Sequence, residues 1–128
     1  TRYPLVTGVQ TCALPIWNMD SSRDWGHSYD YVRAMHLILN HSKAKDWIVS
    51  TGETRTIREL CEYVFSSLGM NYKDYVIQNE KYMRPEELNY LKGDSQEIRN
   101  KLGWKPTYTF ETMIDEMIET WQKKLSNV

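Results

Sequence analysis

Residues 23–27 hold the first group of side chains whose types could do chemistry, in the order Arg-Asp-Trp-Gly-His. An arginine in a loop ahead of a helix can direct two N–H donors at a diphosphate, and a neighbouring tryptophan offers a flat apolar face. The same residues also fit a purely structural interpretation, in which Arg23 and Asp24 form an ion pair beside a packed Trp25. Without other motifs, the residues favour this structural interpretation over phosphate binding. The loop is therefore a candidate phosphate-binding loop whose assignment depends on other motifs.

Arg84 is the second candidate, because a proline follows it. Proline biases the preceding residue toward extended backbone conformations, which limits the freedom of the loop and helps to fix the direction of the guanidinium. Glu87 lies close enough along the chain to orient that guanidinium or to accept hydrogen bonds from sugar hydroxyls. The residues alone also fit an ordinary surface turn.

The histidines and cysteines indicate no further chemistry. His27, His36 and His41 have no carboxylate or cysteine partners at metal-ligand spacing, so we expect no metal site. Cys12 and Cys61 do not make a disulfide framework, and a reducing cytoplasm is the expected location.

Length and composition indicate one small globular domain. The chain has 128 residues, of which 41% are hydrophobic and 26% charged. The net charge of -1 gives no basic surplus, so we do not expect a nucleic-acid partner. No apolar run approaches the roughly 20 residues that a membrane helix needs, so we do not expect a membrane partner.

Apolar periodicity predicts three substantial helices, at residues 30–40, 56–68 and 110–125. In the last of these a near-continuous apolar stripe opposes an acidic face. Anionic lipid would repel that face, so a membrane-surface helix is disfavoured. We expect the stripe to pack in the core rather than to bind a partner.

Capping residues indicate where the helices begin and end. Thr56 and Asp94 are each followed three residues later by a glutamate, the pattern of a capping box, so Asp94 is expected to cap a short fourth helix. Gly69 and Gly103 follow the second helix and the short helix, at the position that favours glycine. Asp30 is interpreted as a helix-start residue rather than a catalytic acid.

Two short strands are predicted, at residues 47–51 and 75–78. Two short strands cannot make a stable sheet by themselves. We therefore expect them to extend a sheet that residues outside this chain supply.

Four motifs occur together in the sequence, and their combination is more specific than any one of them. They are residues 18–27 (Asn-Met-Asp-Ser-Ser-Arg-Asp-Trp-Gly-His), 50–54 (Ser-Thr-Gly-Glu-Thr), 82–87 (Tyr-Met-Arg-Pro-Glu-Glu) and 92–106, which begins Lys-Gly-Asp and ends Lys-Leu-Gly-Trp-Lys-Pro. Between residues 18 and 121 the chain resembles the GDP-mannose 4,6-dehydratases of the extended short-chain dehydrogenase/reductase superfamily. The resemblance implies an α/β fold: the C-terminal, substrate-binding part of an extended Rossmann-type NAD(P)-binding enzyme, here mostly helical with two or so short strands.

The resemblance also implies roles for individual residues. Arg23 and Arg84 are expected to hold the diphosphate of a GDP-sugar, with Asn18 and Glu87 in support. With the resemblance added, we expect Arg84 to contact substrate rather than to form a surface turn. Ser22 stands where many members of the family have lysine, which could remove one phosphate contact without abolishing the site.

The chemistry of the family is a redox-assisted loss of water from GDP-mannose that yields GDP-4-keto-6-deoxymannose. A bound NADP takes hydride from C4, water leaves across C5 and C6, and the hydride returns to C6. The resemblance implies a glycine-rich phosphate loop and a Tyr-x-x-x-Lys pair, and neither occurs in this sequence. We therefore expect no catalytic or cofactor-binding residues here, an inactive fragment, and a parent lyase that is a homodimer or homotetramer and binds NADP through its missing N-terminal part.

Two alternatives remain open. The chain could be a fragment of another nucleotide-sugar enzyme of the superfamily, a reductase or an epimerase. It could also be a non-catalytic helical binding module, although the two unpartnered strands argue against independent folding.

Residues 1–17 show no clear period, and residues 6–16 resemble the translation of a common DNA-sequencing adapter. A genuine loop or strand is the alternative. The predicted organisation is an artefactual or disordered leader at residues 1–17. It is followed by a C-terminal nucleotide-sugar-binding portion at residues 18–128, with the Rossmann core missing.

Overall fold

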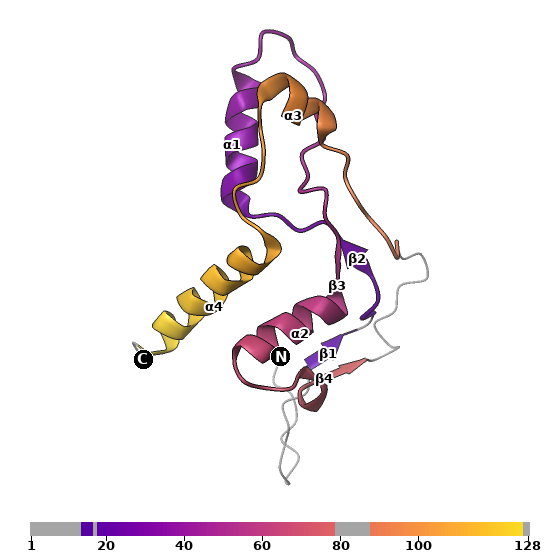
Figure 1. Cartoon of the computed structure of the whole chain (residues 1–128), viewed down its shortest axis with the longest axis vertical. Helices are drawn as coiled ribbons and strands as arrows, with labels where there is room; N and C mark the ends of the chain where they lie inside the picture. The colour runs from indigo at the N-terminus through magenta and orange to yellow at the C-terminus, as the bar shows by residue number, and fades with distance from the viewer. Residues whose placement is uncertain (1–13, 17, 79–87, 127–128) are drawn as a thin grey trace, which may run out of the picture.

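The computed structural model describes residues 14–16, 18–78 and 88–126 (Figure 1). Its helices are α1 (Ser28–Leu39), α2 (Ile57–Ser67), the 3-10 turn η1 (Tyr72–Asp74), α3 (Gln96–Leu102) and α4 (Phe110–Ser126). Its strands are β1 (Leu14–Ile16), β2 (Ser22–Arg23), β3 (Arg55–Thr56) and β4 (Val76–Gln78). The described part is a mixed α/β arrangement in which helices predominate, as predicted.

The strands form two separate pairs. β1 pairs in parallel with β4, with Ile16 opposite Gln78. β2 pairs antiparallel with β3, with Arg23 opposite Arg55. The strand predicted at residues 75–78 is therefore confirmed as β4. Its partner β1 lies in a segment without sequence periodicity, because a strand of three residues is too short to show one.

The strand predicted at residues 47–51 is wrong for the described part of the chain. No strand is assigned there, and the segment has no strand partner among the described residues. A β-branched run becomes a strand only when a neighbouring backbone bonds to its N–H and C=O groups. Ile48 is 60% exposed on this segment. Whether the segment extends a sheet outside this chain stays a prediction.

Two clusters of buried side chains hold the elements together. One lies between α1, α3 and the segment after α3, and it consists of Ala34, Ile98 and Trp104. The other lies where β1, α2 and β4 meet, and it consists of Met19, Cys61 and Val76. Figure 1 shows the same division, with α1 beside α3 in one part and α2 beside β1 and β4 in the other. Burial raises the pKa of the Cys61 thiol, which suits an inert core residue.

The helix ends follow the predicted capping residues, with one correction. At α2 the Thr56 hydroxyl accepts a hydrogen bond from the Glu59 N–H at 3.1 Å, and Glu59 accepts one from the Thr56 N–H at 2.6 Å, so this capping box is confirmed. The N-cap of α3 is Ser95 rather than Asp94. Asp94 accepts a hydrogen bond from the Gln96 N–H at 3.0 Å, while Glu97 forms ion pairs with two lysines instead of closing a box.

The apolar stripe of α4 is only partly in the core. Met113 and Ile114, near its start, are buried, as predicted. Met117, Trp121 and Leu125 are 54%, 60% and 71% exposed, so the prediction is wrong for the C-terminal half of the helix. These side chains line an apolar groove of about 540 Å³ between α4 and α2. None of the helices in the described ranges has the length and hydropathy needed to span a membrane.

Candidate functional site

β2 and the loop after it position Arg23. Ser22 donates its backbone N–H to the Asn89 carbonyl at 2.8 Å and accepts a hydrogen bond from the Leu91 N–H at 3.1 Å. On its other side β2 pairs with β3. The backbone at Arg23 is therefore held from both sides, and its half-buried side chain donates from Nη1 to the Ser22 carbonyl at 2.9 Å.

Asn18 lies at the turn that leads into β2. Its Oδ1 accepts a hydrogen bond from the Asp20 N–H at 3.0 Å, and its Nδ2 lies 3.4 Å from Oδ1 of Asn89. Asn18 and Ser22 thus contact the same residue, Asn89. The structure therefore brings the neighbourhoods of Asn18 and Arg23 together beside residues 89–91.

Arg84 and Glu87, the other two predicted substrate contacts, lie outside the described residues. The described residues on either side of that segment are placed, however. Gln78 pairs with Ile16 in the β1–β4 register, and Asn89 contacts Asn18 and Ser22. Gln78 and Asn89, the described residues on either side of this segment, thus both contact residues within the range 16–22.

The Asp24 carboxylate bonds to a turn that is far away along the chain. One of its carboxylate oxygens accepts hydrogen bonds from the Thr51 N–H at 2.9 Å and the Thr51 hydroxyl at 2.5 Å. The other accepts one from the Gly52 N–H at 2.9 Å. Sequence spacing could not reveal this role, because the two partners are 27 and 28 residues away.

Trp25 packs against the start of α4. Its ring stacks on Phe110 with the centroids 5.9 Å apart, and the Arg55 guanidinium lies 5.7 Å from the Phe110 centroid. Arg55 also lies 3.4 Å from Glu111. Trp25, Arg55 and Phe110 line a cleft of about 160 Å³ between the loop and the start of α4. Trp25 is therefore packed on Phe110, as the structural interpretation expects, and it also lines this cleft.

His27 joins the loop to α1 and to α4. Its Nδ1 accepts a hydrogen bond from the Tyr29 N–H at 3.1 Å, which makes it the N-cap of α1. Its ring stacks on Tyr108 at 3.9 Å between centroids, and its Nε2 lies 3.6 Å from Glu116. A hydrogen bond to Glu116 raises the pKa of Tyr108. No three His, Cys, Asp or Glu side chains converge on a metal position within residues 14–16, 18–78 and 88–126.

Asp30 is a buried clamp rather than a simple helix-start residue. Its carboxylate accepts hydrogen bonds from the Thr107 N–H at 2.9 Å, the Thr107 hydroxyl at 2.6 Å and the Tyr108 N–H at 3.0 Å. Arg33 donates a fourth at 3.1 Å. Burial raises the pKa of Asp30, but the hydrogen bonds from Thr107, Tyr108 and Arg33 outweigh burial and hold it below its ordinary value.

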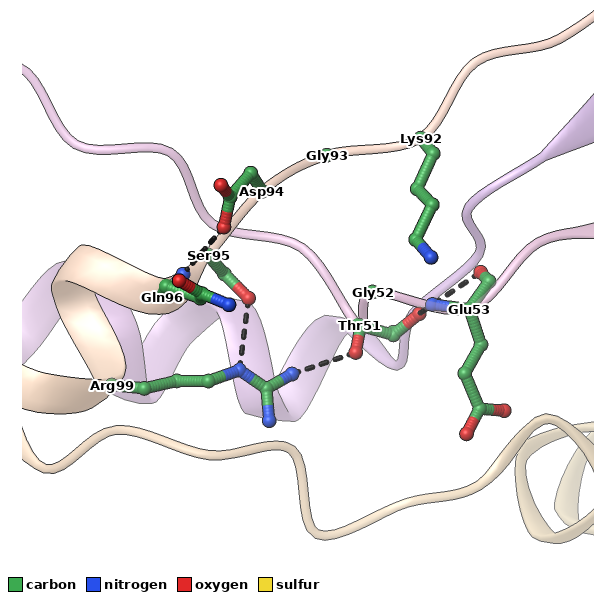
Figure 2. A pocket seen from close by; sticks show the side chains of 9 residues that line it. All are labelled: Thr51, Gly52, Glu53, Lys92, Gly93, Asp94, Ser95, Gln96 and Arg99. Carbon is green, nitrogen blue, oxygen red and sulfur yellow. Dashed lines mark hydrogen bonds between the residues drawn. The ribbon is translucent and has the colours of Figure 1, made fainter.

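A polar cavity of about 650 Å³ lies beside the Thr51–Gly52 turn (Figure 2). Arg99 reaches across it from α3, donating from Nη2 to the Thr51 carbonyl at 2.6 Å and from Nε to the Ser95 hydroxyl at 2.9 Å. The Ser95 hydroxyl in turn donates to the Ser50 carbonyl at 2.9 Å. Two of the four sequence motifs, residues 50–54 and 92–106, therefore meet at this turn.

Comparison with known proteins gives the family of this chain. A sequence profile described as GDP-mannose 4,6 dehydratase matches residues 6–117. GDP-mannose 4,6 dehydratase 1 of Arabidopsis thaliana is 41% identical over 112 residues, which cover 88% of this chain and 31% of the relative. The human GDP-mannose 4,6 dehydratase is 35% identical over 118 residues, which cover 79% of this chain and 32% of the relative. The chain thus spans about a third of the length of the curated relatives it matches.

Solved structures agree on the fold. RMD from Pseudomonas aeruginosa, complexed with NADPH, matches with a TM-score of 0.77 at 24% identity, over 91% of this chain and 38% of that one. A dTDP-glucose 4,6-dehydratase from Bacillus anthracis, in complex with NAD, matches with a TM-score of 0.74 at 22% identity, over 87% of this chain and 34% of that one. The fold is that of a part of the extended Rossmann-type short-chain dehydrogenases.

The matched span includes residues 6–16, whose resemblance to an adapter translation stays a prediction. The profile covers most of the chain, and the motifs at residues 18–27, 50–54, 82–87 and 92–106 all lie within it. On this evidence the chain belongs to the GDP-mannose 4,6-dehydratase family.

Proposed function

We propose that this chain is the substrate-holding part of a lyase that converts GDP-mannose to GDP-4-keto-6-deoxymannose and water. The family match over residues 6–117 carries the proposal. The chain by itself is inactive, because its sequence contains neither a Tyr-x-x-x-Lys pair nor a glycine-rich phosphate loop. The whole enzyme acts in the cytoplasm as a homodimer or homotetramer.

Arg23 grips the diphosphate in this proposal. A guanidinium offers donors in a planar fork that matches phosphate oxygens, and its charge does not depend on pH in the physiological range. The fixed backbone of β2 supports this role, because an arginine on a held strand loses less freedom when it binds. Asn18 supports the same ligand from beside Asn89. Arg84 and Glu87 complete the grip as sequence-based assignments.

NADP is the proposed cofactor of the whole enzyme, but the residues present here do not fit it. A dinucleotide site needs glycines between a strand and the first turn of a helix. Of the three described glycines with positive φ, Gly69 and Gly103 follow the C-terminal ends of α2 and α3, and Gly52 is a single glycine ahead of β3 rather than part of a glycine-rich run. We therefore assign cofactor binding to the rest of the enzyme and no redox step to these residues.

The proposal is tested by isothermal titration of the chain with GDP and with GMP. Arg23→Gln should weaken GDP binding by about tenfold to a hundredfold, because a hydrogen bond to a charged group contributes about 1.5–3 kcal/mol. GMP binding should fall much less if Arg23 grips the diphosphate. Lys124→Gln, which removes the same charge at the far end of α4, should leave both affinities unchanged.

Two results would contradict the proposal. Absence of GDP binding by the unsubstituted chain would refute a substrate-holding role for it. Equal losses of GDP and GMP affinity in Arg23→Gln would refute the assignment of Arg23 to the diphosphate.

A further inference from the structure

The Asp24 carboxylate is committed to one turn of the protein. Its three hydrogen bonds, at 2.9, 2.5 and 2.9 Å, all come from Thr51 and Gly52. Hydrogen bonds from backbone N–H groups to a carboxylate are charge-assisted and stronger than neutral ones. Asp24 therefore ties the loop that carries Arg23 to the Thr51–Gly52 turn.

That turn is itself fixed from its other side. Arg99 donates to the Thr51 carbonyl at 2.6 Å and is oriented by Ser95, as Figure 2 shows. Gly52 has a φ of +82°, a left-handed conformation that glycine adopts without strain. The turn can thus serve as a rigid support for the loop that carries Arg23 and that Asp24 attaches to it.

The loop also lies directly on the turn. A Cβ on Gly26 would come within 2.9 Å of the Thr51 methyl carbon and 2.4 Å of the Tyr31 hydroxyl. Only a glycine backbone can approach this closely. Arg23 therefore lies between two fixed points, since Ser22 is held by residues 89–91 and Asp24 by the turn.

We propose that Asp24 is a positioning residue for Arg23, an inference that rests on the proposed function of Arg23 as a diphosphate ligand. Asp24 does not touch the ligand. It holds the loop in the binding conformation before the ligand arrives, so that little conformational freedom is lost on binding. Without Asp24 the loop after Arg23 would lose its attachment to the turn, and more of its conformational freedom would be lost on binding.

Asp24→Asn separates this role from simple electrostatics. The amide keeps the shape of the carboxylate but replaces one acceptor oxygen with an NH₂ group that faces N–H donors. The loss of a negative charge near the diphosphate should by itself strengthen GDP binding. We expect the opposite, a loss of at least about tenfold in GDP affinity by isothermal titration, which corresponds to about 1.4 kcal/mol.

The matched control is Asp20→Asn, which removes the same charge from the same stretch of chain. Asp20 is exposed and pairs with Arg58 instead of the turn, so GDP affinity should change less than about twofold. Thr51→Val removes the hydroxyl that donates to Asp24 and also accepts from the Glu53 N–H at 3.1 Å, but it keeps both backbone donors to Asp24, so it should give an intermediate loss. If Asp24→Asn does not fold, as judged by the loss of its far-UV circular dichroism signal, Thr51→Val is the variant that tests the inference.

A double-mutant cycle identifies the route of the effect. If Asp24 acts through Arg23, Asp24→Asn should add less than about threefold to the loss already caused by Arg23→Gln. Independent, additive losses would overturn the positioning role, as would unchanged GDP affinity in Asp24→Asn. Absence of GDP binding by the unsubstituted chain would refute the proposed function and this inference together. Binding by the unsubstituted chain with no effect of Asp24→Asn would refute this inference alone.

Discussion

Asparagine in place of Asp30 should remove much of the stability of the chain, because that side chain is 1% exposed and its carboxylate accepts four hydrogen bonds. The amide keeps the shape but turns an NH₂ group toward the backbone N–H donors of Thr107 and Tyr108. A buried donor left unsatisfied costs about 1–3 kcal/mol. Because the Thr107 and Tyr108 N–H groups both face the substituted carboxyl group, we expect the free energy of unfolding to fall by about 3 kcal/mol.

Urea unfolding followed by far-UV circular dichroism measures this loss. With an m value of about 1–2 kcal/mol/M, the midpoint should move down by roughly 1.5–3 M. Tryptophan fluorescence should report the same transition, because the indole N–H of the buried Trp104 donates to the Asp30 carbonyl at 2.8 Å.

The pH dependence gives a second, independent check. The folded state lowers the pKa of Asp30, so the carboxylate contributes stability that is fully present above its unfolded-state pKa of about 3.9. That contribution is lost as the pH falls through the lower pKa of the folded state. The stability difference between the unsubstituted chain and Asp30→Asn should therefore be constant near neutral pH and shrink below about pH 4.

Arg33→Gln is the control for the Asp30 clamp. Its side chain is 36% exposed and supplies only one of the four bonds, so its loss should cost less than about 1 kcal/mol. The Asp30 clamp would be refuted as a source of stability if Asp30→Asn cost no more than Arg33→Gln, or if the stability difference between Asp30→Asn and the unsubstituted chain did not change with pH.

Three further predictions concern local features. Thr56→Ala should lower the free energy of unfolding by about 1 kcal/mol in urea by removing the cap of α2, and Thr56→Ser should restore it; equal losses in both variants would contradict the cap. Gly93→Ala should lower the free energy of unfolding by about 2 kcal/mol or more, because its Cβ would lie 2.4 Å from the Cβ of Ser50. Ser50→Gly in the same chain should recover part of that loss, and no recovery would point to another cause. The hydrogen bonds from Lys101 and Lys45 lower the pKa of Glu97 to about 2. An NMR titration of Lys101→Gln should therefore show the pKa of Glu97 closer to its ordinary value. An unchanged pKa would mean that Lys101 does not cause the shift.

The helices could be predicted from the sequence because their signals are local. The apolar spacing of α2, the Thr56–Glu59 box and the glycine at Gly69 all lie within 14 residues of one another. The N-cap of α3 is Ser95, one residue after the predicted Asp94, and both residue types are good caps. Such errors are small because the competing residues are neighbours.

The clamps could not be predicted, because their partners are far away along the chain. Asp30 bonds to residues 77 and 78 positions away, and Asp24 to residues 27 and 28 positions away. Each aspartate fits a local role, as a helix-start residue or an ion-pair partner. Periodicity likewise shows that one face of α4 is apolar but not whether anything covers it, and Trp121 is 60% exposed.

The two clamps together explain why the candidate binding loop is well placed on a small scaffold. Asp24 fixes the loop to the Thr51–Gly52 turn, and Asp30 fixes the start of α1 to Thr107 and Tyr108. The intervening residues include Trp25 and His27, which pack on Phe110 and Tyr108. The segment that follows Arg23 is thus tied at both ends and packed between them. The two aspartates should therefore differ in their effects: the loss of the buried Asp30 clamp acts mainly on folding, while the loss of the half-buried Asp24 clamp acts mainly on the geometry of the arginine.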